Sequence, residues 1–234
     1  MKTVAIVLAA GSGKRMNSNT KKQYLAIGKY PVLYYSIKAF EDSFIDEIVL
    51  VTGPDDVEYC REEIVNKYGF KKVSSIIVGG KERYHSVNNG LKACGNCDYV
   101  FIHDGARPFV TDEILNRALE KVKATGAAVV GMPVKDTIKI VDNKAVVTDT
   151  PNRSNVWLVQ TPQCFEYKAI LDAYEDMLAN ETSLLNRGIK ITDDAMVMEE
   201  FGSIPVSLVE GSYDNIKITT PDDLVHAETI LNKR

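Results

Sequence analysis

The amino-acid sequence predicts an α/β protein built on a doubly wound, mostly parallel sheet. Short apolar runs rich in Val and Ile recur along the first 132 of its 234 residues, as expected for strands that are buried on both faces. Stretches with helical periodicity separate these runs, and the connections are short. Such an alternation gives right-handed strand–helix–strand units, whose helices cover both faces of one sheet.

Five apolar runs are the predicted strands. The first spans residues 4–10 and leads into Gly11, and the others lie at residues 47–52, 73–78, 99–103 and 127–132. Helices are predicted between them at residues 31–40, 54–68, 83–94 and 111–124. The last of these begins with Thr111, Asp112 and Glu113, which are residue types that stabilise a helix N-terminus.

The pattern changes after Pro133. Residues 134–149 predict two short strands around a turn at Asp142 and Asn143. An isolated hairpin is only marginally stable in water, so this protruding β-arm, residues 134–154, is expected to pack on something else, such as a second subunit. Helices follow at residues 166–180 and 193–201, then a strand at 205–209 and a last helix from Pro221 with Thr220 as N-cap. With no linker or repeat, residues 1–234 are predicted to form one domain.

The composition excludes several classes of protein. Hydrophobic residues make up 45% of the chain and charged residues 26%, which excludes a collagen, a disordered tail and a disulfide-stapled miniprotein. The net charge of −4 argues against a general nucleic-acid binder. No apolar run is long enough for a membrane span, and the run at residues 4–9 is too short for a secretory leader. We therefore expect a cytoplasmic protein without nucleic-acid or membrane partners.

Cys94 and Cys97 form the one C-x-x-C pair among four cysteines. A redox motif would open a helix after a strand, whereas this pair closes a helical stretch. The three histidines show no spacing that would complete a zinc site. The cysteines are predicted to be unpaired thiols.

The charge is distributed unevenly. Residues 1–40 contain seven Lys and Arg but no Asp or Glu, which indicates an anion site. Gly11 and Gly13 follow the first strand, where glycines let backbone N–H groups approach anionic oxygens. Arg15 and Lys22 add a planar donor fork and a point charge for phosphate. The alternative is an ordinary solvated basic loop.

Two known phosphate-binding motifs do not fit this loop. A Walker A loop requires Gly and Ser or Thr where Leu8 and Arg15 stand. A dinucleotide fingerprint requires a third Gly at Met16 and an acidic residue about 20 positions further on, yet the first acidic residue is Glu41. The sequence supports neither kinase-like binding nor NAD binding.

Asp104 follows the strand at residues 99–103 and precedes Gly105. Ligands of open α/β sheets bind at the carboxyl ends of the strands, so Asp104 lies on the same edge as the glycine loop. A carboxylate facing a polyphosphate is a natural Mg²⁺ ligand. The alternative is that Asp104 caps a turn and pairs with Arg107. His103 is expected to pack or to support neighbouring groups, not to act as a base.

Nine segments together resemble the cytidylyltransferases of the non-mevalonate isoprenoid pathway, which join CTP to 2-C-methyl-D-erythritol 4-phosphate. In chain order they are LAAGSGKRM, KKQYL, GGKERYHSV, HDGARPFV, PVKDTIK, TPNRSNVW, QTPQCF, TDDAM and LVEGSYDNIKIT. The resemblance runs along nearly the whole chain. It implies a Rossmann-like nucleotidyltransferase fold, CTP as co-substrate, Mg²⁺ as cofactor and a homodimer whose arms cross between subunits.

Two alternatives are weighed against this resemblance. Ribitol-5-phosphate cytidylyltransferases share the segments HD-x-x-RPF, TPQ-x-F and NIKITTP. Their first loop, however, resembles Leu-Ala-Gly-Gly, whereas this chain has Leu8-Ala9-Ala10-Gly11. A nucleotide-binding regulator without turnover would not need the full set of charged residues. One departure is Lys81, where the family often has an acidic or small residue.

The resemblance also implies roles for individual residues. Arg15 and Lys22 would stabilise the transition state at the α-phosphate of CTP, and Asp104 would support Mg²⁺. Arg153, supplied by the neighbouring subunit's arm, and Lys217 would hold methylerythritol phosphate for attack. The cytidine would be framed by Ala9, Ala10, Gly80 and Ser86, with Gly11 and Gly13 near the triphosphate. The sugar-phosphate pocket would be lined by Ala106, Arg107, Thr137, Thr161 and Thr192.

Overall fold

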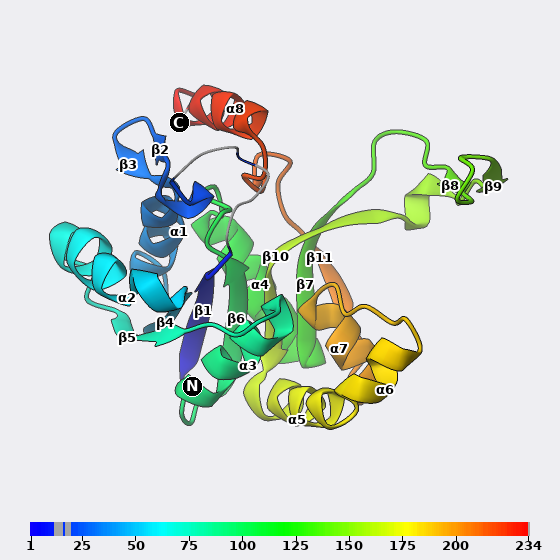
Figure 1. Ribbon diagram of the computed structural model, residues 1–234, viewed down its shortest axis with the longest axis horizontal. Coiled ribbons are helices and arrows are strands. Elements are labelled where there is room, and N and C mark those ends of the chain that lie inside the picture. The colour runs from blue at the N-terminus through cyan, green and yellow to red at the C-terminus, as the bar shows by residue number, and fades with distance from the viewer. Residues whose placement is uncertain (12–15, 17–19, 234) are drawn as a thin grey trace.

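A seven-stranded sheet with helices on both faces forms the centre of the protein (Figure 1). The computed structural model describes residues 1–11, 16 and 20–233. The strand order is β11-β7-β10-β6-β1-β4-β5, and only β10 runs antiparallel to its neighbours in this sheet. The bounds are β1 Thr3–Ala9, β4 Glu47–Thr52, β5 Val73–Val78, β6 Tyr99–Asp104, β7 Ala127–Pro133, β10 Trp157–Glu166 and β11 Ser207–Glu210. The predicted doubly wound, mostly parallel α/β fold is confirmed.

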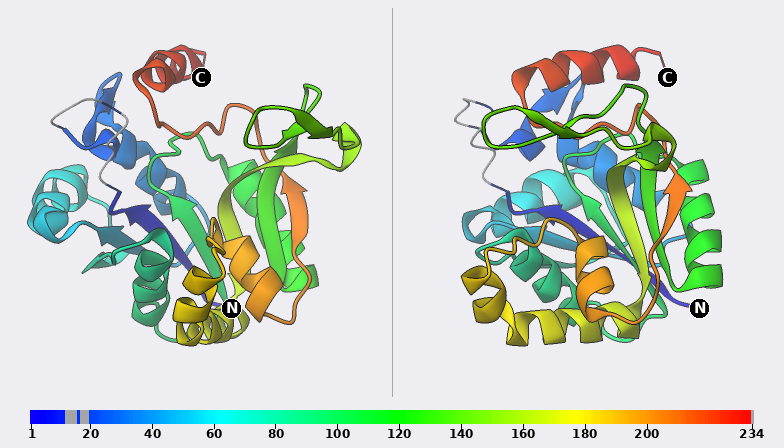
Figure 2. Two further views of the ribbon diagram at one scale, coloured as in Figure 1. Left: turned by 45° about the vertical axis from the view of Figure 1, so that its right-hand side comes forward. Right: turned by 90° about the vertical axis from the view of Figure 1, so that its right-hand side faces the viewer.

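Helices cover both faces of the sheet (Figure 2), and two apolar clusters fill the space between the sheet and these helices. The first packs one face against α1 (Val32–Glu41), α4 (Asp112–Thr125) and the helix that begins as α2 (Val57–Tyr59) and continues as a π-helix (Cys60–Asn66). The second packs the other face against α3 (Arg83–Ala93), α5 (Tyr167–Ala179), α6 (Glu181–Asn186) and α7 (Asp194–Phe201). Side chains of β1 alternate between the two clusters, which explains its continuous apolar sequence.

The ends of α4 show how the sequence sets helix boundaries. Thr111 is the N-cap, and its hydroxyl accepts a hydrogen bond from the backbone N–H of Ile114. Gly126 ends the helix with a φ of 79°, in the left-handed region that favours glycine, and its N–H donates to the carbonyl of Val122 at 2.8 Å. The predicted helix at residues 111–124 is thus confirmed within one residue.

A small third cluster lies beyond the carboxyl ends of the strands. The hairpin of β2 (Ala26–Ile27) and β3 (Tyr30–Pro31) packs there against α8 (Pro221–Leu231). Thr220 begins α8 in a capping box with Asp223, as the sequence predicts for its N-cap. Through this cluster α8 is held beside the β2–β3 hairpin (Figure 1).

Strand β10 is the main element that the sequence analysis missed, together with α6 and the β2–β3 hairpin. Its centre contains Gln160, Thr161, Pro162 and Gln163, and such residues argue against a central strand. The structure accommodates them through a register shift against β7 between Val159 and Gln163. The three polar side chains are buried and hydrogen-bonded, so they carry little desolvation penalty.

The arm between β7 and β10 projects away from the sheet (Figures 1 and 2). It carries the short antiparallel strands β8 (Ile140–Val141) and β9 (Val147–Asp149), which confirms the predicted pair. Asp142 shapes the turn between them, because its Oδ1 accepts hydrogen bonds from the N–H groups of Lys144 and Val146, both at 2.9 Å. Four apolar side chains of the arm are about half exposed, namely Ile140, Val141, Val146 and Val147.

Two further predictions can be compared with the structure. All four cysteines are free thiols, and Cys94 caps the C-terminus of α3 as expected. Within residues 1–11, 16 and 20–233, no helix combines the length and apolar character that crossing a membrane requires.

Candidate active site

A pocket of about 410 Å³ opens at the carboxyl ends of β1 and β6, where ligands of open α/β sheets bind. We call it the central pocket. Five segments supply its walls: the end of β1, the turn around Lys22, the start of α3, the end of β6 and the segment before α8. Among the described residues, it is lined by Leu8, Ala9, Ala10, Gly11, Lys22, Gln23, Gly80, Lys81, Glu82, Arg83, Ser86, Asp104, Ala106 and Lys217.

The turn that carries Lys22 is tied to the end of β1. The buried Gln23 amide donates hydrogen bonds from Nε2 to the carbonyls of Ala9 at 2.6 Å and Gly11 at 3.2 Å. On the other side, Lys22 Nζ donates to the carbonyl of Ile218 at 3.0 Å. Three segments distant in sequence therefore fix the position of the Lys22 ammonium.

The start of α3 forms the opposite wall. The backbone N–H of Gly80 donates to Ser86 Oγ at 3.0 Å, and Glu82 and His85 close a capping box on the helix. A Cβ on Gly80 would collide with the Cβ of His85, and one on Gly79 would lie 2.7 Å from the Cβ of Ala10. Only glycines fit between the first loop and this helix, so they bring backbone within reach of a ligand in the pocket.

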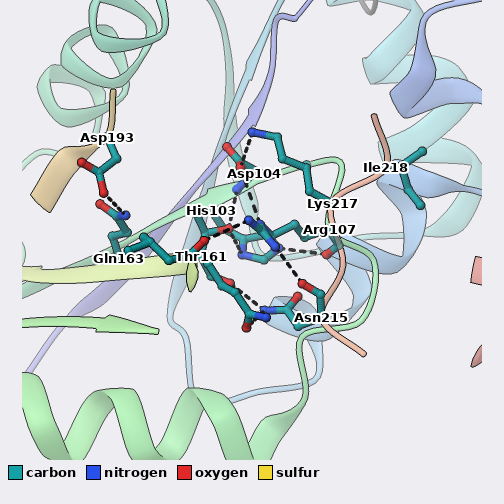
Figure 3. Close-up of polar contacts among 12 residues, drawn as sticks. His103, Asp104, Arg107, Thr161, Gln163, Asp193, Asn215, Lys217 and Ile218 are labelled. Carbon is teal, nitrogen blue, oxygen red and sulfur yellow. Dashed lines mark hydrogen bonds and ion pairs between the residues drawn. The ribbon is translucent and has the colours of Figure 1, made fainter. Parts of the chain in front are cut away.

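Asp104 is the buried carboxylate at the floor of the pocket, and three cations lie around it. Figure 3 shows two of them, Lys217 and Arg107. Lys217 Nζ lies 2.8 Å and Arg107 Nε 3.7 Å from its Oδ2, and Arg83 Nε lies 3.6 Å from its Oδ1. Burial opposes ionisation of Asp104, but the charges of Arg83, Lys217 and Arg107 outweigh it and hold the pKa of the carboxyl well below its usual range. Asp104 is therefore charged at any physiological pH.

His103 and Thr161 fix the turn that presents Asp104 (Figure 3). The backbone N–H of Asp104 donates to Thr161 Oγ1, which lies 3.0 Å from Nδ1 of the buried His103. The other ring nitrogen, Nε2, lies 3.0 Å from the carbonyl of Arg107, which can only accept, so Nε2 carries the proton and the threonine hydroxyl donates to Nδ1. Burial lowers the pKa of His103 to about 4, so the ring is neutral and supports the turn instead of acting as a base.

Arg107 and Asn215 bind the C-terminal segment to β10. Arg107 Nη1 donates to the carbonyl of Asn215 at 2.7 Å, and the Asn215 amide donates to the carbonyl of Thr161 at 2.9 Å. The N–H of Ile218 donates to the carbonyl of Ala106 at 2.8 Å. These bonds fix the backbone that carries Lys217, so its ammonium reaches Asp104.

Arg83 connects the pocket to α7. Its Nη1 and Nη2 donate to the two carboxylate oxygens of Asp194 at 2.8 and 2.7 Å. Asp194 is fully buried, and its Oδ1 also accepts the hydroxyl of Tyr174 at 2.6 Å. Beside it, Asp193 caps α7 and accepts the amide of Gln163, which belongs to β10 (Figure 3). The start of α3 is thus fixed to the start of α7.

Comparison with known proteins agrees with this geometry. The family model described as 2-C-methyl-D-erythritol 4-phosphate cytidylyltransferase matches residues 3–233. The chain belongs to this family. Curated relatives of that name include one from Lachnoclostridium phytofermentans, 47% identical over 99% of this chain and 97% of the relative, and one from Clostridium botulinum, 50% identical over 99% and 98%.

Solved structures of family members share the fold. The crystal structure of 4-diphosphocytidyl-2C-methyl-D-erythritol synthase from Anaerococcus prevotii matches with a TM-score of 0.85 and 35% identity, covering 99% of this chain and 96% of that one. The enzyme from Thermus thermophilus matches with a TM-score of 0.73 and 30% identity, covering 99% and 100%. The resemblance inferred from nine segments is confirmed, and it is favoured over a ribitol-phosphate enzyme and over a regulator without turnover.

The structure of this cytidylyltransferase brings together nine of the predicted site residues. They are Ala9, Ala10, Gly11, Lys22, Gly80, Ser86, Asp104, Ala106 and Lys217, which all line the central pocket. Arg15 and Gly13 lie outside the described residues. The predicted alternative role of Asp104, pairing with Arg107, coexists with its place in the pocket.

Five predicted residues lie elsewhere in this family member. Arg107 and Thr161 are under the floor, where their polar groups bind protein atoms. Thr137 and Arg153 are exposed at the base of the arm, and Arg153 Nη1 donates to the carbonyl of Lys135 at 3.2 Å. Thr192 lines a separate pocket of about 600 Å³ between the start of α3 and α6, which we call the flanking pocket.

Sequence reasoning missed the residues that hold the site in place. Gln23 and Arg83 stand inside the segments KKQYL and GGKERYHSV, so their place in the resemblance was a signal, but their contacts to Ala9 and Asp104 depend on the fold. Gln160 and Gln163 stand inside the segment QTPQCF, but their contacts could not be predicted because β10 was not predicted as a strand.

Proposed function

We propose that the central pocket joins CTP to 2-C-methyl-D-erythritol 4-phosphate, giving the CDP-methylerythritol product and pyrophosphate. The observation that carries this proposal is the meeting of Lys22 and Lys217 at one pocket, between the glycine-bearing loop and the start of α3. Two polyanions must approach each other in this reaction, and fixed cations lower the electrostatic cost of that approach. Membership of the cytidylyltransferase family supplies the substrates.

The reaction is an in-line displacement at the α-phosphorus of CTP. A phosphate oxygen of the acceptor forms the new P–O bond, and the bond to the β-phosphate oxygen breaks as pyrophosphate leaves. The attacking oxygen is already anionic at neutral pH, so the neutral, buried His103 need not act as a base. Catalysis then consists of positioning and charge neutralisation.

We assign the residues as the family resemblance implies. Arg15 and Lys22 stabilise the charge at the α-phosphate, while Lys217 and Arg153 hold the acceptor phosphate. The cytidine lies against Ala9, Ala10, Gly80 and Ser86, with Gly11 and Gly13 at the triphosphate. The acceptor lies near Ala106, Arg107, Thr137, Thr161 and Thr192.

We propose that Mg²⁺ accompanies the triphosphate and that Asp104 supports it. The oxygens of Asp104 are used unequally, since Oδ2 holds Lys217 at 2.8 Å whereas the cation nearest to Oδ1 lies at 3.6 Å. One carboxylate with phosphate oxygens and water is a typical Mg²⁺ environment. When bound, the ion would neutralise charge on the triphosphate.

We further propose a cytoplasmic homodimer of one-domain subunits. The arm exposes Ile140, Val141, Val146 and Val147, so a second copy would bury apolar surface that this chain leaves in water. An arm that reaches across would bring Thr137 and Arg153 to the neighbour's central pocket, which explains why both lie outside the pocket of their own chain.

Pyrophosphate release from CTP tests the function. We expect release with 2-C-methyl-D-erythritol 4-phosphate and none without an acceptor. Release with D-ribitol 5-phosphate alone would overturn the substrate assignment, and no release with either acceptor would overturn the activity. Inclusion of EDTA tests the metal, since full activity in its presence would contradict a role for Mg²⁺.

A further inference from the structure

Arg83 has contacts in the site that no role assigned above explains. It lines both the central and the flanking pocket, and its guanidinium faces two carboxylates at once. The two Nη atoms form the bidentate pair with Asp194, and Nε faces Oδ1 of Asp104 at 3.6 Å. The pair with Asp194 uses one N–H of each Nη atom, and the Nε–H edge faces Asp104.

The pair with Asp194 fixes the orientation of Arg83. Asp194 is fully buried and receives three donors, two from Arg83 and one from the Tyr174 hydroxyl. A fork-to-fork pair of this kind has a set geometry, and breaking a buried pair leaves an uncompensated charge. The guanidinium therefore cannot turn away, and its Nε edge stays directed at Asp104.

The Nε edge in turn limits the freedom of Asp104. The other two cations, Lys217 and Arg107, both lie at Oδ2. Because the terminal torsion of an aspartate is soft, a carboxylate held only at Oδ2 would rotate and take the Lys217 ammonium with it. Arg83 supplies the opposing contact at Oδ1.

We propose that Arg83 is a positioning residue for the cytidylyl transfer, held by Asp194 so that it fixes Asp104 and, through Asp104, the ammonium of Lys217. This role rests on the proposed function. Arg83 acts through Asp104 and Lys217 and does not itself touch the reacting groups. The same contacts join α3, which bears Ser86 at the nucleotide end, to α7. Arg83 thus holds the start of α3, at the wall of the central pocket, against α7.

Kinetics of Arg83→Gln and Arg83→Lys test this role, with Arg61→Gln as a matched control on an exposed helix surface. We expect Arg83→Gln to lower kcat about 10- to 100-fold and to raise KM for methylerythritol phosphate, because loss of a buried donor near the transition state has effects of this order. The dissociation constant of CTP, measured by calorimetry, should stay within about threefold, because the cytidine contacts remain. Arg83→Lys keeps the charge but not the fork, so it should recover part of kcat.

The double variant Arg83→Gln/Asp194→Asn shows whether Arg83 and Asp194 act as one unit or affect kcat independently of each other. If the two residues act as a unit, the double variant should lose no more kcat than Arg83→Gln alone. If Arg83→Gln does not fold, Tyr174→Phe replaces it, since it removes one donor to Asp194 and keeps the ring in the core. It should lower kcat a few-fold with unchanged CTP binding.

The outcomes distinguish failure of the positioning role alone from failure of the proposed function. Normal kcat in a folded Arg83→Gln, or in Tyr174→Phe if it is the variant used, would overturn the positioning role. So would equal losses in CTP binding and kcat that follow a lower Tm, since they indicate a purely structural role. Wild-type protein that releases no pyrophosphate with methylerythritol phosphate, yet binds CTP less well after Arg83→Gln, would overturn the proposed function and the positioning role together.

Discussion

The floor of the central pocket and the arm both carry residues of the proposed site, but in opposite surroundings. Asp104 is buried among three cations and its turn is held by His103 and Thr161. Arg153 is exposed on the arm, and its guanidinium donates to the carbonyl of Lys135, on the arm's other branch. The described groups of the floor come from one chain, whereas Thr137 and Arg153 of the arm do not line the central pocket of their own chain. Folding of a single chain is therefore sufficient to assemble the floor, but not the part of the proposed site that the arm supplies.

The largest expected effect tests the floor. Lys22→Ala should lower kcat by about 10²- to 10³-fold, because one well-placed donor to a developing charge contributes about 3–4 kcal/mol. The fold should persist, since Lys22 lies at the edge of the pocket and outside the apolar clusters. Steady-state pyrophosphate release measures the effect, and Lys29→Ala, on the exposed hairpin turn, is the matched control. Near-normal kcat in Lys22→Ala would remove it from the catalytic set.

Mixed dimers test the arm. Arg153→Ala and Lys22→Ala are each expected to be nearly inactive, yet an equal mixture should regain up to about a quarter of wild-type activity, because one site of each mixed C₂ dimer would combine two intact residues. The mixture must first be unfolded and refolded together so that subunits exchange. Activity that stays at the level of the single variants would show that Arg153 serves its own chain or none.

The pH dependence of the free energy of unfolding tests whether His103, which supports the turn of Asp104, is neutral in the folded chain. Burial lowers the pKa of His103 from 6.5 to about 4, so between these pH values the unfolded chain binds a proton that the folded chain does not. This contribution to the free energy of unfolding is present above pH 6.5 and falls by about 3 kcal/mol as the pH drops towards 4. Urea unfolding of wild type and His103→Gln at pH 4 and 7 measures it.

The comparison of variants isolates the His103 contribution from other acid effects. The stability difference between wild type and His103→Gln should shrink by that amount at low pH. His226→Gln, on the exposed side of α8, should follow the wild type at both pH values. A constant difference between wild type and His103→Gln would contradict the proposed neutral state of the ring.

The smallest effect on folding is expected in the arm. Val147→Asp places a charge on an exposed strand, so the free energy of unfolding of the isolated subunit should change by no more than about 0.5 kcal/mol. Its effect on association should be far larger, and gel filtration should show a shift from dimer to monomer. Retention of the dimer would mean that another surface joins the subunits.

The sequence predicted the regular parts of this molecule well. Strands such as β1 and helices such as α4 carry their own periodicity and caps, so both their type and their bounds follow from local chemistry. The pocket edge also follows, since Asp104 and Gly11 come directly after predicted strands. Lys22 was indicated by the basic first 40 residues, which contain no Asp or Glu. Lys217 needed the resemblance, because nothing in a local pattern distinguishes it from a surface lysine.

What the sequence did not predict depends on contacts between distant segments. In the sequence Gln163 is an ordinary polar residue. Once β10 lies in the sheet, its side-chain amide donates to Asp193 and accepts a hydrogen bond from the N–H of Ala195. Arg83 likewise resembles a solvated charge at the start of a helix, although its partner is 111 positions away. Local patterns report burial and turns, but they carry no information about which distant side chain a buried polar group meets.

The position of Lys217 and Ile218 near the end of the chain has a consequence for biosynthesis. The carbonyl that receives Lys22 and the ammonium that reaches Asp104 both come from a segment that is synthesised after the whole sheet. Because nascent chains fold from the N-terminus, strands such as β1, β4 and β6 can pair while Asp104 still lacks its nearest cation. Asp104 gains that cation only when the segment of Lys217 and Ile218 folds onto the pocket.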